Sequence, residues 1–177
     1  SSINEKLLNQ QVTLNGWVRT RRGSKGISFI QLYDGSNQNG IQAVADEVLG
    51  NYEEISKLTT GTSVSIIGKV VESPAKGQAF EIHAEEVRVV GASSGDLYPL
   101  QKKGHTLEFL REIAHLRPRT NTLGAVFRLR NTLSWAIHSF FQERDFLYVQ
   151  TPIITANDAE GAGEMFHVTA LDLENLP

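Results

Sequence analysis

The chain has 177 residues, of which 40% are apolar and 21% are charged, a balance typical of a soluble folded protein with one domain or a small domain plus part of another. Its net charge of −3 argues against a globally basic nucleic-acid binder, although local charge still matters. The absence of cysteine excludes disulfides and cysteine-bound zinc, and no apolar run reaches the roughly 18 to 20 residues of a membrane helix, so we expect a protein of the reducing cytoplasm.

Period-two alternation of apolar residues, bounded by turn residues, predicts five strands in the first half of the chain. They are expected over residues 12–18, 27–33, 41–45, 62–72 and 79–90. In the second strand, Ile30 and Leu32 share the face that should be buried. Phe29 lies on the opposite face with polar neighbours, so that face is the candidate for contact with a ligand.

A helix is expected between the third and fourth strands. Val48, Tyr52, Ile55 and Leu58 follow one another at spacings of four, three and three residues, which is helical periodicity. Three strands, a helix and two strands form the order of an OB-fold barrel, whose central strands and loops commonly bind single-stranded oligonucleotides. Other small barrels and α+β folds give the same order, and a fold alone does not fix a function.

Residues 91–99 are rich in glycine, serine and proline, and the apolar period changes after them from two to between three and four. We therefore place a domain boundary in this segment. The expected division is a barrel domain at residues 1–92, a linker at residues 93–120, and the beginning of a second, α/β domain at residues 121–177.

The second part of the chain is predicted to begin with helices. A helix around Leu107 and Leu110 should be interrupted at Pro118, because proline disfavours helix before itself. A longer helix over residues 122–143 carries one apolar stripe, which consists of Val126, Leu129, Leu133, Ile137 and Phe140. Such stripes usually pack in a core. A strand over residues 146–154 should follow, and Pro152 within it is typical of an edge or an interface.

The first two strands combine cations with an exposed aromatic residue. Between residues 17 and 33 the sequence has no acid and four cations, which are Arg19, Arg21, Arg22 and Lys25. An aromatic side chain beside cations can stack on an unpaired base while the cations hold phosphates. Phe29 is the candidate for that role; the alternatives are a solvated basic hairpin and an aromatic residue packed under a loop.

Two further features could bind a ligand. The amide of Gln42 both donates and accepts, so it could read the edge of a base, although it could equally be an ordinary surface glutamine. In the glycine-bracketed segment that contains Glu160, Gly161, Gly163 and Glu164, two carboxylates could close on an ammonium group; a simple turn is the alternative. This segment lacks the spacing of a phosphate-binding loop, and the five histidines show no metal-ligand spacing.

Four stretches of the sequence, taken in order, resemble the bacterial asparaginyl-tRNA synthetases. They are GWVRTRRGSKGISFIQLYDGS (16–36), LTTGTSVSIIGKVVESP (58–74), EFLREIAHLRPRTNTLGAV (108–126) and TPIITANDAEGAGEMFHVTALDLENLP (151–177). The resemblance covers the whole chain. It implies an OB-fold β barrel that grips the anticodon, followed by the α/β start of a class II synthetase catalytic domain.

The resemblance also implies roles for particular residues. Phe29 matches the aromatic residue that stacks on the middle anticodon base, and Gln42 matches the glutamine that reads it. Arg19, Arg21 and Arg22 match the basic strand-loop of the family. The helix and the strand with Pro152 resemble motif 1, which forms a homodimer interface, so that Ile137 and Phe140 are expected in that interface. Residues Glu160, Gly161, Gly163 and Glu164 match the mobile loop that closes over the bound amino acid.

A full-length member of this family attaches asparagine to tRNA(Asn) through an asparaginyl-adenylate, using ATP and magnesium. Motifs 2 and 3, which hold ATP, have no match before Pro177, so we expect this chain by itself to bind no cofactor and to be inactive. Aspartyl-tRNA synthetase is an alternative; the run Gly163-Glu164-Met165-Phe166 favours asparagine, because aspartyl enzymes usually carry an arginine-aspartate pair there. A noncatalytic RNA-binding module with an OB-fold is the other alternative.

Overall fold

The computed structural model describes residues 3–101, 104–155, 161, 166 and 168–172. The chain divides into two compact units, Ser1–Thr132 and Leu133–Pro177. The division falls within the long helix of the second half of the chain and not in the segment 91–99. The predicted domain boundaries, which rest on composition and periodicity, therefore stay a prediction.

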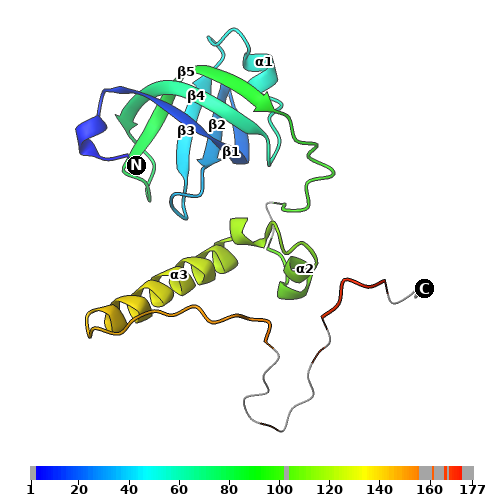
Figure 1. Cartoon of the computed structure of the whole chain (residues 1–177). Helices are drawn as coiled ribbons and strands as arrows, with labels where there is room; N and C mark the ends of the chain where they lie inside the picture. Colours follow the sequence, from blue (N-terminus) through cyan, green and yellow to red (C-terminus); the bar gives the residue numbers. More distant parts are fainter. Residues whose placement is uncertain (1–2, 102–103, 156–160, 162–165, 167, 173–177) are drawn as a thin grey trace. The chain divides into compact units, whose positions relative to one another are not determined.

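The first unit contains a closed barrel of five strands (Figure 1). The strands are β1 (Gln11–Ser24), β2 (Ile27–Tyr33), β3 (Ile41–Asp46), β4 (Ser63–Glu72) and β5 (Phe80–Gly91). Their order around the barrel is β1-β2-β3-β5-β4, and β1 also pairs with β4 to close it. All neighbours are antiparallel except β3 and β5. The predicted OB-fold barrel is confirmed.

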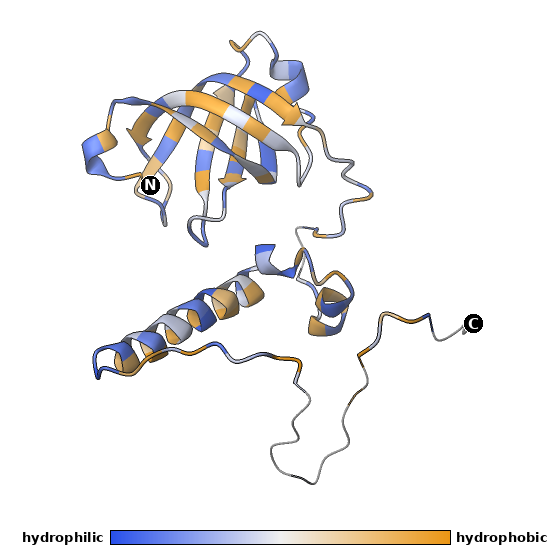
Figure 2. Cartoon of the chain, viewed as in Figure 1, coloured by the Kyte–Doolittle hydropathy of each residue, from blue (hydrophilic) through white to orange (hydrophobic). Residues whose placement is uncertain are grey.

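The barrel core is built from alternate residues of each strand, as the sequence pattern predicts. Ile30 and Leu32 are 0% and 3% exposed, while their sequence neighbours on β2 are only partly buried. Strand β4 contributes Val64, Ile66 and Val70 to the same core. Figure 2 shows the alternation of apolar and polar residues along the strands. The predicted assignment of the two faces of β2 is therefore confirmed.

The turn between β1 and β2 has two central residues with left-handed backbone conformation. Lys25 has a φ of 46° and Gly26 a φ of 80°, and Ser24 pairs directly with Ile27. Positive φ at both positions is the mark of a type I′ hairpin turn, whose twist matches that of the flanking strands. The turn predicted at residues 23–26 is thus confirmed, although β1 continues through Ser24.

The helix predicted from Val48 to Leu58 is much shorter in the structure. Helix α1 covers only Tyr52–Ile55, and Val48 is 87% exposed. The carboxylate of Asp46 accepts a hydrogen bond from the Val48 N–H, which holds the chain in a turn that competes with helix. Ile55 and Leu58 do pack in the core, so the periodicity marked buried positions but overestimated the length of the helix.

Two short helical elements and one long helix follow the barrel. Helix α2 (Leu107–Glu112) is capped by Thr106, whose hydroxyl accepts from the Phe109 N–H, and Leu110 on it is buried. A 3-10 turn, η2 (Arg117–Arg119), contains Pro118, and helix α3 (Asn121–Gln142) starts two residues after η2 ends. The predicted interruption at Pro118 and the predicted long helix are both confirmed.

Helix α3 buries none of its residues among those that the structure describes. Its apolar stripe is solvent-exposed, with Leu129 at 60% and Ile137 at 59%.

The strand predicted over residues 146–154 is wrong, since these residues form no strand. A strand needs a partner for its backbone hydrogen bonds, and the described residues offer it none. No helix in the described part of the chain has the length and apolarity to cross a bilayer.

The barrel leaves no room for a side chain at Gly68. A Cβ atom built there would lie 2.3 Å from the carbonyl oxygen of His83 and 2.9 Å from the Cα of Ala84. Because both contacts are to backbone, relief requires β4 and β5 to move apart. We expect Gly68→Ala to reduce the free energy of unfolding by about 1–3 kcal/mol, measured by urea denaturation followed by circular dichroism.

Gly50→Ala is the matched control. A Cβ atom at Gly50 would meet no atom within 4 Å, so this variant should unfold at the urea concentration of the parent chain or slightly above it. Equal midpoints for Gly68→Ala and Gly50→Ala would contradict the close approach of β4 and β5.

Candidate nucleic-acid interface

The outer face of β1, β2, β3 and β5 carries a row of side chains centred on Phe29. The strand register aligns Arg22 with Phe29, Phe29 with Val44, and Val44 with His83. Phe29 is partly exposed, while Arg22 and His83 at the two ends of the row are exposed. Residue Lys69 of β4 is next in register to His83. An accessible aromatic ring therefore lies in a row with basic or protonatable side chains on both sides, which suits base stacking with phosphate contact.

The three arginines predicted to act together point in different directions. The β1–β2 register shifts between Val18 and Thr20, which is a β-bulge that reverses the facing of every later residue on β1. Arg22 consequently joins Phe29 on the outer face. Arg21 pairs with the core residue Ile30, and its Nη1 atom donates to the hydroxyl of Ser28 at 3.3 Å.

Arg19 lies at the bulge and connects separate parts of the first unit. Its Nη1 atom donates to the carbonyl oxygen of Gln38 at 3.0 Å, and its Nη2 atom donates to the side-chain oxygen of Asn121. The guanidinium also lies over the ring of Tyr33, 5.8 Å from the centroid. Two of its donors thus bind within the protein, and Arg22 is the member of the predicted trio that is best placed to contact a ligand at Phe29.

Gln42 is not an ordinary surface glutamine. It occupies the outer face of β3 next to Gln31, yet it is only 7% exposed. Its Nε2 atom donates to Oε2 of Glu81 at 3.0 Å, and Glu81 is itself 4% exposed. A buried carboxylate thus fixes the direction of the amide, which is what recognition of one base edge requires.

Glu81 is the centre of a polar cluster that the sequence did not reveal. Besides Gln42, its Oε2 atom accepts from the Ser73 hydroxyl at 2.9 Å and from Gln78 Nε2 at 3.3 Å. Its other oxygen lies 3.6 Å from His83 Nε2. The loop between β4 and β5 supplies Ser73 and Gln78, so it covers this edge of the face. In the sequence, Glu81 is an acidic residue between the apolar residues Phe80 and Ile82. This pattern does not predict that its carboxylate is buried.

The loop between β2 and β3 borders the same face and is ordered by its own side chains. The Ser36 hydroxyl and N–H both donate to Asp34 Oδ1, at 2.6 and 2.8 Å, and these hydrogen bonds, the hydroxyl first, lower the pKa of Asp34. Asn37 accepts from two backbone N–H groups further along the loop. Gln31 donates to the Asn39 carbonyl at 2.7 Å, so the loop is tied to the strand that carries Phe29.

Helix α3 holds this loop from the other side. Arg128 donates to the carbonyl oxygens of Gly35 and Ser36, and Gln38 Nε2 donates to the Asn121 carbonyl at 2.7 Å. The loop therefore links the outer face of the barrel to the first half of α3.

The predicted amino-acid loop and the predicted dimer interface are not built up by contacts in the way that the face around Phe29 is. Glu160, Gly163 and Glu164 lie outside the described residues; Gly161 is described, and its φ is 66°. Ile137, Phe140 and Pro152, predicted to lie in a dimer interface, are exposed. Among the described residues, no three histidine, cysteine or acidic side chains come together in a way that could hold a metal ion.

Comparison with known proteins finds a family match in each half of the chain. Residues 12–90 match the OB-fold nucleic acid binding domain, and residues 106–175 match the tRNA synthetases of class II (D, K and N). The two matches lie on either side of the segment predicted to separate the domains.

The curated relatives are asparagine--tRNA ligases. That of Vibrio cholerae is 58% identical over 173 residues, which cover 96% of this chain and 37% of the relative. That of Desulfitobacterium hafniense is 58% identical over 170 residues, 96% of this chain and 36% of the relative. The chain thus spans little more than a third of the length of these relatives.

Solved structures agree with this relationship. The crystal structure of asparaginyl-tRNA synthetase from Pyrococcus horikoshii has a TM-score of 0.76 and 26% identity, covering 85% of this chain and 36% of that chain. The same enzyme complexed with asparaginyl-adenylate has a TM-score of 0.75 and 27% identity, covering 84% and 34%. In the order of its two matched regions and in its sequence identity, the chain is similar to part of the asparagine--tRNA ligases, and its residues 106–175 match the class II tRNA synthetases (D, K and N).

Proposed function

We propose that the barrel binds the anticodon of a tRNA on the outer face of β2 and β3. The observation that carries this proposal is the row in which Phe29 is flanked by Arg22 and, beyond Val44, by His83. In the proposed complex, Phe29 stacks on the middle anticodon base and Gln42, held by Glu81, reads that base. Arg22 contacts phosphate, while Arg19 and Arg21 support the strand from which Arg22 projects.

The complete protein is proposed to be an asparaginyl-tRNA synthetase that attaches asparagine to tRNA(Asn) in the cytoplasm. ATP and magnesium would supply the adenylate chemistry, outside the anticodon face. The two curated relatives described above carry the name asparagine--tRNA ligase, which supports asparagine over aspartate as the amino acid. The synthetase match over residues 106–175 supports an enzyme rather than a noncatalytic RNA-binding module.

The stacking role of Phe29 is tested by truncation. Phe29→Ala should weaken binding of an RNA hairpin that carries the asparagine anticodon by about 1–3 kcal/mol, the contribution of one base–aromatic stack. Fluorescence anisotropy of a labelled hairpin at fixed salt measures the dissociation constant. Phe29→Tyr should bind as the parent chain does, because the ring is retained.

Phe146→Ala is the control for loss of an exposed aromatic side chain, since Phe146 is 59% exposed and lies outside the barrel. It should bind the hairpin with unchanged affinity. If Phe29→Ala also bound the hairpin as tightly as the parent chain, base stacking on Phe29 would be ruled out.

Base reading by Gln42 is tested against its neighbour Gln31. The two glutamines are directly paired on the same face, but Gln31 is tied to the loop carbonyl of Asn39. Gln42→Ala should reduce the preference for the cognate middle base, because side-chain contacts to base edges carry sequence information and phosphate contacts do not. Gln31→Ala should keep that preference.

Hairpins that differ only at the middle anticodon base provide the measurement. Arg22→Ala should weaken all of them by the same factor and lower the salt dependence of binding. A preference that is the same in Gln42→Ala as in the parent chain would show that Gln42 only supports the barrel.

We also propose that α3 forms a homodimer interface. Its stripe leaves Leu133, Ile137 and Phe140 more than half exposed, and exposed apolar side chains that lie together often mark an interface. A two-fold interface would cover the same stripe on both copies. Ile153, next to Pro152, is 99% exposed and would extend the covered surface.

Sedimentation velocity over a range of protein concentrations tests this assembly. The parent chain should sediment as a dimer or a larger species, whereas Ile137→Asp should be monomeric, because a buried unpaired charge opposes association. Asn131→Asp, with the charge on the other side of α3, should behave as the parent chain does. A parent chain that stays monomeric at every concentration would refute the proposed interface.

Catalysis is expected only from a polypeptide that carries the remainder of the relatives' length. With asparagine, ATP and magnesium, the 177-residue chain should show background pyrophosphate exchange, because loss of even one group that stabilises transition-state charge commonly lowers the rate about 100- to 1000-fold. A polypeptide of full length should exchange labelled pyrophosphate in an asparagine-dependent manner. Exchange with aspartate instead would change the proposed amino acid but leave the proposed anticodon face intact.

A further inference from the structure

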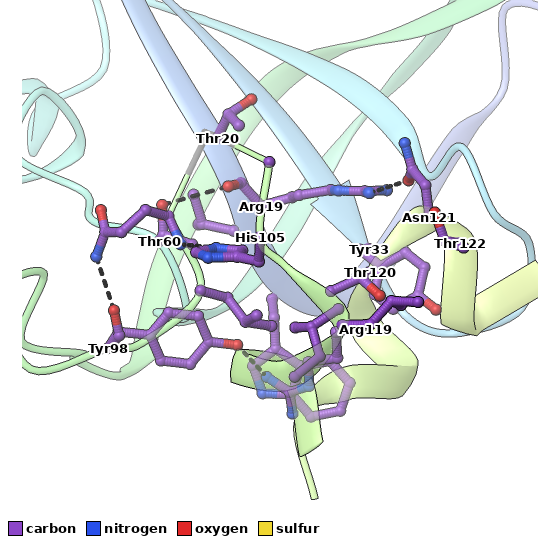
Figure 3. Close-up of a pocket in the computed structure, with 17 residues that line it drawn as sticks. Arg19, Thr20, Tyr33, Thr60, Tyr98, His105, Arg119, Thr120, Asn121 and Thr122 are labelled. Carbon is purple, nitrogen blue, oxygen red and sulfur yellow. Dashed lines mark hydrogen bonds between the residues drawn. The ribbon is translucent and has the colours of Figure 1, made fainter. Parts of the chain in front are cut away.

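A cavity of about 430 Å³ lies in the first unit, away from the Phe29 row (Figure 3). Strands β1 and β2 line it with Trp17, Arg19 and Tyr33, and the chain between the barrel and α3 lines it with Tyr98, His105 and Arg119. Tyr33 and Phe29 are four residues apart on β2, or about 13 Å at the rise of a strand. The cavity therefore lies at one end of the outer face, separate from Phe29 but next to the proposed anticodon site.

The charge of the cavity lining has one sign. Its residues include two arginines and no aspartate or glutamate. A cavity with cations and no acid attracts anions, because no internal carboxylate competes for the positive charge. Its volume is in the range of pockets that hold small molecules, which begins at about 300 Å³.

Arg119 is held in place by aromatic partners. Its guanidinium lies over the Trp17 ring, 4.6 Å from the centroid, and its Nη1 atom donates to the Tyr98 hydroxyl at 3.0 Å. Among the described residues this is the only hydrogen bond that the guanidinium makes. Because an arginine side chain has five N–H donors, most of its capacity stays available to a ligand in a fixed direction.

The walls of the cavity are of mixed polarity and contain internal hydrogen bonds. Leu100 and Leu110 form an apolar part and are 7% and 3% exposed. The His105 ring accepts from the Gln101 N–H at 3.1 Å and stacks on Phe109, and Gln101 Nε2 donates to the Tyr98 carbonyl at 2.7 Å. Figure 3 shows the hydroxyl groups of Thr60 and Thr120 among the labelled residues of the lining. A ligand here would meet aromatic rings, hydroxyl groups and a cation together.

We infer that this cavity binds a nucleoside monophosphate, with the phosphate at Arg119 and the base against the aromatic and aliphatic wall. Aromatic rings accept the flat face of a base, hydroxyl groups suit a ribose, and the guanidinium pairs with phosphate through two parallel hydrogen bonds. The occupant is either a free nucleotide or one nucleotide of an RNA chain, since both present this chemistry.

Trp17 supplies a direct signal for binding. The chain has two tryptophans, so Trp135→Phe leaves Trp17, in the cavity wall, as the sole indole. In this background, AMP should change the tryptophan fluorescence in a saturable manner. Adenosine, which lacks the phosphate, should bind at least about tenfold more weakly, and inorganic phosphate, which lacks the base, should also bind more weakly. This comparison of ligands requires no further mutation.

Arg119→Met tests the cation and keeps the length of the side chain. It should lower the affinity for AMP at least about tenfold, and its circular dichroism melting curve shows whether it folds. Arg111→Met is the matched control, because Arg111 is an exposed arginine on α2 that does not line the cavity. It should bind AMP as the Trp135→Phe parent does.

Competition identifies the source of the nucleotide. If the anticodon hairpin displaces AMP, the occupant is a nucleotide within RNA; if AMP and the hairpin bind together, it is a free nucleotide. The inference is overturned if AMP gives no saturable signal up to millimolar concentration, if Arg119→Met binds AMP normally, or if phosphate alone binds as tightly as AMP. Because hairpin binding is measured separately, these failures would leave the proposed anticodon face intact.

Discussion

Closure of the barrel by β1 is the constraint on which the other features depend. This strand pairs with β4 along its first half and with β2 along its second half, so it must bend between two neighbours. At Gly16, a Cβ atom would lie 2.8 Å from the Tyr33 carbonyl oxygen; only glycine permits the approach. Without closure, the unpaired edges of β2 and β4 would expose backbone hydrogen-bonding groups, and the outer face that carries Phe29 would lose its curvature.

The bulge at Arg19 lies where β1 passes from β4 to β2, and it decides which cation faces outward. A β1 without the bulge would place Arg21 on the outer face and Arg22 on the inner face. With the bulge, Arg22 stands beside Phe29, while Arg19 is free to join the β2–β3 loop and Asn121. One additional residue in β1 therefore leaves Arg22 at the surface, while Arg19 and Arg21 make hydrogen bonds within the protein.

The sequence predicted correctly those parts of the fold in which apolar residues follow one regular spacing, either that of a strand or that of a helix. Ile30 and Leu32 alternate strictly and are buried, and Pro118 breaks the helical pattern where the structure does. The bulge was not predictable, because the apolar alternation of β1 ends at Val18 and no later residue reveals the change of facing. The burial of Glu81 was not predictable either, because it depends on a loop that returns over β5. The strand expected around Pro152 failed because local pattern cannot supply a pairing partner.

The pairing of β3 with β5 is the shortest strand pairing of the barrel, and it lies next to Gln42, the residue proposed to read the anticodon. Strands β3 and β5 are parallel and share only two residue pairs, Ala43 with Ile82 and Val44 with His83. Gln42 and Glu81 directly precede the paired residues Ala43 and Ile82. The hydrogen bond between their side chains therefore adds one more contact between β3 and β5. The residue proposed to select a base thus also joins β3 to β5. Any change of specificity at position 42 must therefore be compatible with the closure of β3 against β5, which narrows the set of side chains that this position accepts.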